Sequence, residues 1–119
     1  MRCAMESVDE RYERGVSLKV EGKYDEALVE FNSILQGDPD NAEAHRQIGL
    51  IYGFIGLFDE SLQELTAAVQ LDPSNLAARN DLGLTYAMLG MADEAKAEFE
   101  AVLTADPEND IAKRNIIYF

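Results

Sequence analysis

The sequence contains no tryptophan, one cysteine, one histidine and three prolines among 119 residues. The lone Cys3 cannot form a disulfide within the chain. The lone His45 rules out a two-histidine metal pair, and any serine or cysteine nucleophile would depend on that single imidazole. No run of about 18 or more apolar residues could span a bilayer. These absences disfavour an enzyme, a metal site and a membrane protein, and we expect no cofactor.

Basic residues are also scarce. Ten lysines and arginines stand against 23 aspartates and glutamates, so the formal charge is −13. Such a chain repels phosphate backbones and anionic membrane surfaces, which disfavours nucleic acid and lipid as partners. The N-terminal stretch lacks the apolar segment of a secretory signal, so we expect a cytoplasmic protein. A hydrophobic content of 47% is enough for one folded core.

What the chain does contain is a repeat of 34 residues. Its three prolines, Pro39, Pro73 and Pro107, are 34 residues apart. Glycines, a small residue, a large apolar residue and an asparagine recur in the same register. These columns are Gly15, Gly49 and Gly83; Gly22, Gly56 and Gly90; Ala27, Ser61 and Ala95; Phe31, Leu65 and Phe99; and Asn41, Asn75 and Asn109.

Each repeat is predicted to form two helices. Apolar residues recur at helical spacing, glycine can close the first helix, an Asp-Glu pair opens the second, and proline ends the unit. The asparagines are predicted caps of the next first helix, and Ser7 with Glu10 has the spacing of a capping box. Because the acidic pairs recur at every second helix, they indicate capping rather than an active site. The predicted helices span residues 8–21, 24–37, 42–55, 58–71, 76–89, 92–105 and 110–118.

These columns resemble the tetratricopeptide repeat family. Ile48-Gly49, Tyr52 and Pro73 follow the family signature in the second repeat, as do Leu82-Gly83, Tyr86 and Pro107 in the third. Arg11, His45 and Arg79 replace its leading tryptophan. The resemblance implies an all-α, right-handed α-solenoid of three helix-turn-helix units with a C-terminal closing helix. The predicted parts are an N-terminal segment 1–7, repeats 8–41, 42–75 and 76–109, and a terminal helix 110–119. The small glycines should let helices approach while Phe31, Leu65 and Phe99 fill the space between them.

The resemblance also places function on a concave face formed by the first helices, where an apolar floor with a polar rim suits a peptide or an amphipathic helix. The predicted binding residues are Tyr12, Arg46, Gln47, Leu50, Phe54, Asn80, Leu84, Met88, Arg114 and Asn115. Family members that bind acidic chaperone C-termini use a clamp of lysine, asparagine and arginine. The matching positions here, Tyr12, Val16, Gln47, Ala77 and Asp81, supply no cation, so that partnership is disfavoured.

Half of the basic residues fall at the fourth or fifth place of a first helix: Arg11, Arg46, Arg79, Lys113 and Arg114. Two readings stay open. They pair with Asp38, Asp72, Asp106 and the carbonyl ends of preceding helices, or Arg46, Asn80 and Arg114 form a rim that holds a bound peptide. His45 is expected to pack at a helix start near the preceding loop.

The predicted function is a non-catalytic interaction module that binds a protein or peptide. The alternative is a scaffold that assembles through its repeat ends as a homo-oligomer. The final residues, Ile116, Ile117, Tyr118 and Phe119, either pack onto the third repeat or mark a fragment or an oligomer contact.

Overall fold

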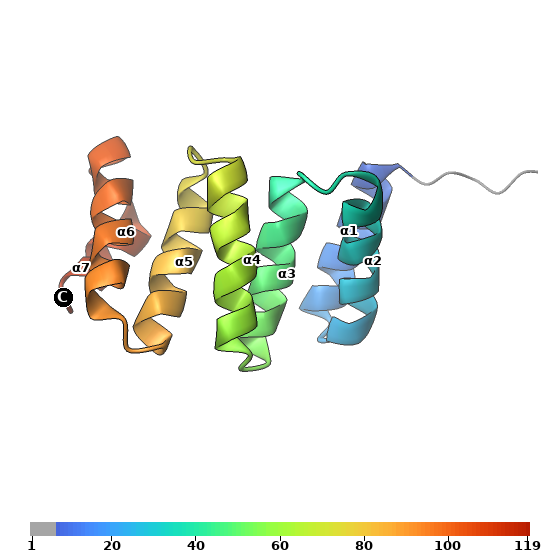
Figure 1. Ribbon diagram of the computed structural model, residues 1–119, viewed down its shortest axis with the longest axis horizontal. Coiled ribbons are helices and arrows are strands. Elements are labelled where there is room, and N and C mark those ends of the chain that lie inside the picture. Colours follow the sequence, from blue (N-terminus) through green and yellow to red (C-terminus); the bar gives the residue numbers. More distant parts are fainter. Residues whose placement is uncertain (1–6) are drawn as a thin grey trace, which may run out of the picture.

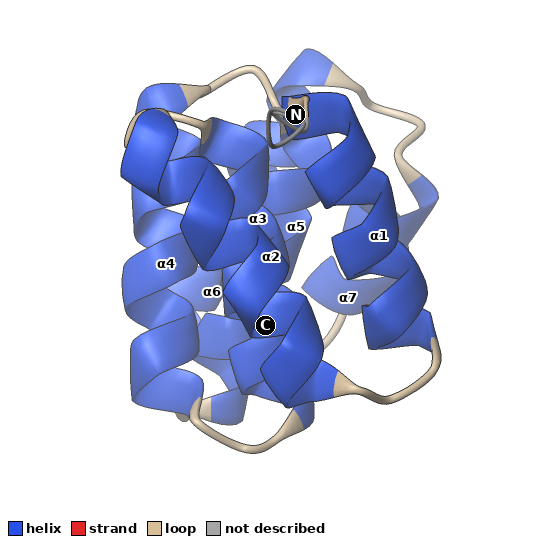
Figure 2. Ribbon diagram, turned by 90° about the vertical axis from the view of Figure 1, so that its right-hand side faces the viewer, coloured by secondary structure: helices blue, strands red, loops and turns tan. Residues whose placement is uncertain are grey.

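The computed structural model describes residues 7–119, and this part of the chain folds into helices joined by short turns, with no strand (Figures 1 and 2). The seven helices are α1 (Val8–Val20), α2 (Tyr24–Gly37), α3 (Ala42–Phe54), α4 (Phe58–Leu71), α5 (Leu76–Met88), α6 (Ala92–Ala105) and α7 (Asp110–Ile116). The all-α solenoid predicted from the sequence is therefore confirmed. Cys3 lies outside the described residues.

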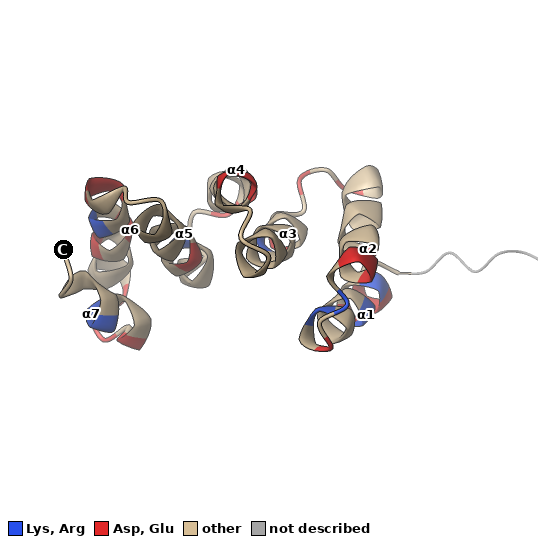
Figure 3. Cartoon of the chain, turned by 90° about the horizontal axis from the view of Figure 1, so that it is seen from below, with Lys and Arg blue, Asp and Glu red and all other residues tan. Residues whose placement is uncertain are grey.

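The helices stand side by side in chain order, from α1 and α2 at one end to α7 at the other (Figure 1). Most contacts join neighbours in sequence, so the molecule is elongated, with extents of 57 × 27 × 21 Å. Seen along the helices, the row bends into an arc, with α4 on its outer side and α1 and α7 at its two inner ends (Figure 3). The inner side of this arc is the concave face.

The helix boundaries follow from the predicted caps. Asn41, Asn75 and Asn109 each accept a hydrogen bond from the backbone N–H three residues later, and Ser7 forms a capping box with Glu10. Gly22, Gly56 and Gly90 take φ values of 80°, 83° and 76°, the left-handed conformation that closes the first helices. These caps end α1, α3 and α5 one residue earlier than predicted.

The last helix is also shorter than predicted. It ends at Ile116, because Tyr118 and Phe119 donate to carbonyls only three residues back, at Asn115 and Ile116. Ile116 packs in the third apolar cluster, and the ring of Phe119 stacks on Phe99 with centroids 6.1 Å apart. Ile117 and Tyr118 are exposed. The terminus therefore packs in part onto α6 and leaves two apolar side chains in solvent.

Each first helix packs closely on the following second helix at a glycine. A Cβ atom placed on Gly15, Gly49 or Gly83 would lie 2.7, 2.8 or 2.9 Å from the side chain of Phe31, Leu65 or Phe99. These three large side chains are fully buried. The prediction that glycine permits the close approach and that Phe31, Leu65 and Phe99 fill the space is confirmed.

A second recurring contact involves the residues that stand where the family signature has its leading tryptophan. Arg11, His45 and Arg79 each contact a glutamate 19 residues later, at 3.4 Å to Glu30, 2.8 Å to Glu64 and 3.2 Å to Glu98 respectively. The predicted partners Asp38, Asp72 and Asp106 are wrong, because those carboxylates accept hydrogen bonds from Asn41, Ser74 and Asn109 instead. The same reading also expected backbone carbonyls after the preceding helix, and Arg79 does donate to the Pro73 carbonyl at 3.0 Å. The contacts with the glutamates, of which those of Arg11 and Arg79 are ion pairs, tie the first helix of each pair to the second.

His45 lies where it was expected, at a helix start beside the preceding loop. Its ring nitrogens contact Glu64 at 2.8 Å and the Pro39 carbonyl at 2.9 Å. Burial disfavours the charged ring, but the bonds to Glu64 and Pro39 outweigh it and raise the pKa of His45 above its ordinary value of 6.5. This residue is a structural link between α3 and α4.

The glycine contact can be tested by Gly83→Ala. The new methyl group would overlap the buried ring of Phe99, so we expect a loss of about 1–3 kcal/mol of unfolding free energy, measured by urea denaturation. Gly37→Ala is the matched control, because a Cβ atom there meets nothing within 4 Å. An equal effect of the two substitutions would contradict the account.

Candidate functional site

The concave face holds an apolar pocket between α3 and α5, with α4 as its floor. Its volume is about 240 Å³. It is lined by Gly49, Leu50, Gly53, Phe54, Phe58, Ser61, Leu65, Asp81, Leu84, Thr85 and Met88. A side chain at Gly53 would reach toward Ser61, so this glycine leaves space open at the floor. A pocket of this size and lining accepts one or two apolar side chains.

Large apolar side chains stand exposed at the mouth of the pocket. Phe54 is 59% and Met88 64% exposed, and Leu84 is exposed as well. The Phe54 ring also lies 6.0 Å from the ring of Tyr24, which limits its motion on the side toward α2. Of the predicted binding residues, Leu50, Phe54, Leu84 and Met88 therefore come together in one surface.

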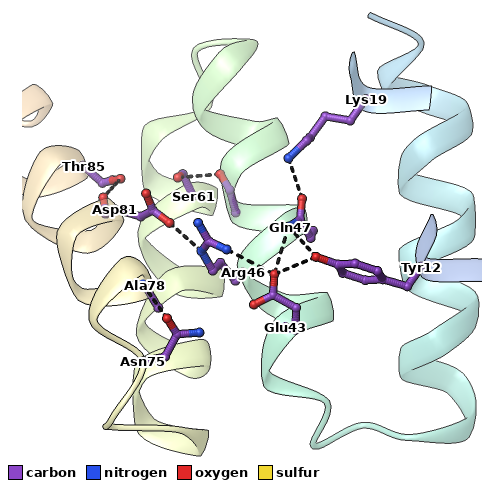
Figure 4. Close-up of polar contacts among 11 residues, drawn as sticks. Tyr12, Lys19, Glu43, Arg46, Gln47, Ser61, Asn75, Ala78, Asp81 and Thr85 are labelled. Atoms are coloured by element: carbon purple, nitrogen blue, oxygen red, sulfur yellow. Dashed lines mark hydrogen bonds and ion pairs between the residues drawn. The ribbon is translucent and has the colours of Figure 1, made fainter. Parts of the chain in front are cut away.

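Beside the pocket, a hydrogen-bonded network joins α1 to α3 (Figure 4). The hydroxyl of Tyr12 donates to Oε2 of Glu43 at 3.0 Å, and the amide of Gln47 donates to the same oxygen at 2.9 Å. Lys19 Nζ donates to Oε1 of Gln47 at 2.6 Å. Burial of Lys19, together with nearby Arg46, lowers its pKa below the ordinary value.

Arg46 extends this network from α3 to α5. Its Nε donates to Oδ2 of Asp81 at 2.7 Å, and its Nη1 donates to Oε2 of Glu43 at 3.1 Å. Figure 4 shows the guanidinium between the two carboxylates. Burial raises the pKa of Asp81 above 3.8 even though Arg46 favours the charged form. We call these six residues, Tyr12, Lys19, Glu43, Arg46, Gln47 and Asp81, the groove network.

A second hollow, of about 310 Å³, lies at the N-terminal ends of α1 and α3. It is lined by Val8, Asp9, Tyr12, Asn41 and Glu43. Tyr12 and Glu43 belong to both this hollow and the groove network. The concave face thus offers an apolar pocket at one place and an acidic hollow at another.

Three predicted binding residues lie elsewhere. Asn80 was expected on the rim, and that position is wrong: its side chain is 2% exposed and donates to Asn109 at 3.1 Å. Arg114 and Asn115 donate to backbone carbonyls of Asp110 and Ile111 in their own helix, and neither lines the apolar pocket or the acidic hollow.

Sequence reasoning missed Lys19 and Glu43. A signal for Glu43 was present, because it lies three residues before Arg46 and four before Gln47, on one face of the helix. Lys19 has no comparable signal, since its contact with Gln47 joins residues from different helices.

Within residues 7–119, no three His, Cys, Asp or Glu side chains are placed to hold a metal ion, and no helix is long and apolar enough to cross a membrane.

The fold defines a helical-repeat solenoid with a concave face. The sequence profile of the tetratricopeptide repeat family matches residues 56–114. No curated protein sequence matches the chain significantly.

Solved structures agree with the profile. The first tetratricopeptide domain of Spaghetti (RPAP3), bound to the HSP90 peptide SRMEEVD, has a TM-score of 0.88 and 26% identity over 93% of this chain and 88% of that one. The second such domain of human RPAP3, in complex with the HSP70 peptide SGPTIEEVD, has a TM-score of 0.84 and 28% identity over 94% and 97%. The chain belongs to the tetratricopeptide repeat family.

A further match shows the fold alone. An O-GlcNAc transferase of Thermobaculum terrenum has a TM-score of 0.86 at 22% identity, and the match covers 93% of this chain but 21% of that enzyme. The fold thus also occurs as part of a larger enzyme.

The charge of Asp81 can be tested through the pH dependence of stability. The pKa of Asp81 is raised in the folded state, so ionised Asp81 lowers the free energy of unfolding at pH values above its pKa in both the folded and the unfolded state. Below about 3.8 the carboxyl group is protonated in both states, and this loss of stability disappears. Asp81→Asn keeps an oxygen for Arg46, so we expect it to be more stable than the parent at pH 7. The difference should shrink as the pH falls toward 3.8, as followed by urea denaturation. A less stable variant at pH 7 would show that the ion pair with Arg46 outweighs burial.

Proposed function

We propose that the protein is a non-catalytic interaction module that binds a peptide or a helix in the concave groove. One observation carries this proposal: an apolar pocket bordered by exposed Phe54, Leu84 and Met88 lies between α3 and α5. Exposed apolar patches rimmed by polar residues mark binding surfaces in water. The peptide complexes of the two RPAP3 domains support the same use of this fold.

The proposed roles follow from position. Leu50, Phe54, Leu84 and Met88 would contact apolar side chains of the ligand. Tyr12, Arg46 and Gln47 would fix the polar edge through the groove network and offer hydrogen bonds to a peptide backbone. Arg114 and Asn115, on α7, would contact only a ligand that runs on toward that end of the arc. Asn80 would act through Asn109, by holding α7 in place.

Self-assembly through the repeat ends is the second candidate. The exposed side chains of Ile111, Ile117 and Tyr118 at the α7 end favour it, since they leave apolar surface that another copy could cover. The mass in solution decides between the two candidates. A monomer at high protein concentration would contradict assembly as the main role.

The groove is tested by Phe54→Glu and Met88→Glu, each of which places a charge at the mouth of the pocket. We expect both variants to lose capture of a partner from a lysate of the native cell at least about tenfold, since burying an unpaired carboxylate is costly. Circular dichroism should show unchanged helix content, because both side chains are exposed.

Val29→Glu is the matched control. Val29 is 63% exposed, nearly the same as Met88, but lies on α2 and lines neither hollow. The control should capture as well as the parent. If all three variants capture equally, the groove is not the binding site.

A further inference from the structure

Each of the two carboxylates of the groove network accepts hydrogen bonds through only one of its two oxygens. Glu43 accepts three hydrogen bonds, from Tyr12, Arg46 and Gln47, and all three go to its Oε2. Asp81 accepts from Arg46 through Oδ2 alone. Among residues 7–119, no partner contacts Glu43 Oε1 or Asp81 Oδ1. Two ordered acceptor oxygens are thus left for a ligand.

The two carboxylate residues line the two hollows. Asp81 is the one charged residue of the apolar pocket lining, and Glu43 lines the acidic hollow together with Asp9. Figure 4 shows the two carboxylates on opposite sides of Arg46, one on α5 and one on α3. An apolar side chain seated in the pocket would therefore have a fixed carboxylate next to it.

The cations of the groove are already engaged. Arg46 is shared between Asp81 and Glu43, and Lys19 donates to Gln47. Carboxylates outnumber cations along the two hollows, because Asp9 adds to Glu43 and Asp81. The whole chain carries a formal charge of −13, which attracts a cationic partner and repels an anionic one.

From these observations we propose that the groove selects a basic apolar peptide: a segment whose apolar side chain enters the pocket while a lysine or arginine next to it donates to Glu43 or Asp81. A charged donor suits these sites, because hydrogen bonds between ionised groups are the strong ones. The raised pKa of Asp81 fits, since a ligand cation would offset the cost of keeping this carboxylate charged in a mostly buried place. The inference rests on the proposed groove function and adds the chemistry of the ligand.

The test uses the purified full chain and a library of randomised seven-residue peptides, with the peptide SGPTIEEVD, which carries no lysine or arginine, as an acidic probe. We expect the bound fraction to be enriched in peptides that pair Leu, Ile, Phe or Met with Lys or Arg, and depleted in Asp and Glu. SGPTIEEVD should bind at least about tenfold more weakly than the best basic peptide, as expected when one charged hydrogen bond is replaced by repulsion.

Variants that remove the charge of one carboxylate test whether Glu43 and Asp81 cause the preference for basic peptides. Glu43→Gln and Asp81→Asn should each weaken the best basic peptide about tenfold, measured by fluorescence anisotropy. They should change binding of the same peptide with its basic residues replaced by glutamine much less. Glu60→Gln is the control, because Glu60 is an exposed acid at the start of α4, outside both hollows.

The outcomes separate the two proposals. If peptides bind and Met88→Glu abolishes binding, but the selected peptides are acidic or show no charge preference, the groove stands and the basic ligand is wrong. If no peptide binds, if binding survives Met88→Glu, or if only a second copy of the chain occupies the groove, the peptide-binding proposal itself is wrong. Equal loss in Glu60→Gln and Asp81→Asn would also overturn the basic-ligand inference, because the effect would then come from overall charge.

Discussion

The packing of the helices depends on the contact between a glycine on the first helix of each pair and a large side chain on the second helix. At Gly15, Gly49 and Gly83 the absence of a Cβ atom lets Phe31, Leu65 or Phe99 fill the space that a side chain would occupy. Packing at this density leaves the spacing of the two helices little freedom. The same contact recurs in all three helix pairs, which stack into one arc (Figure 3). One of these contacts, between Gly49 and Leu65, also lines the apolar pocket.

The groove network imposes the second constraint. Where the apolar pocket opens between α3 and α5, Arg46 bridges the two helices to Asp81, and through Glu43 it reaches Tyr12 of α1. This polar crossing fixes the first helices relative to one another at the concave face. It keeps an ionised carboxylate in a mostly buried place, which apolar packing would not require. A mostly buried carboxylate with a raised pKa beside a cleft is typical of a candidate functional site.

The fold was predictable because its signals are local and repeated. Caps at Asn41 and Gly56 and the 34-residue spacing define helix type and order within the chain itself. The helix ends differ by one or two residues because capping residues share part of the helical geometry.

The site was less predictable. Exposed Phe54 and Met88 follow from helical position, but the burial of Asn80 depends on Asn109, which belongs to the next turn of the solenoid. Likewise, the partners of Arg11 and Arg79 lie 19 residues away on another helix, so nearby aspartates were a reasonable but wrong choice. The unused oxygens of Glu43 and Asp81 depend on side-chain geometry that no sequence pattern contains.

The central claim is that ligands enter the inner side of the arc. Amide and methyl chemical shifts, followed by NMR as the best library peptide is added to the full chain, test it most directly. The account predicts that the largest shifts fall on α3 and α5, at Leu50, Phe54, Leu84 and Met88, with contacts from the peptide to their side chains. Shifts concentrated on the outer surfaces of α2, α4 and α6, or at Ile117 and Tyr118 beyond α7, would contradict it.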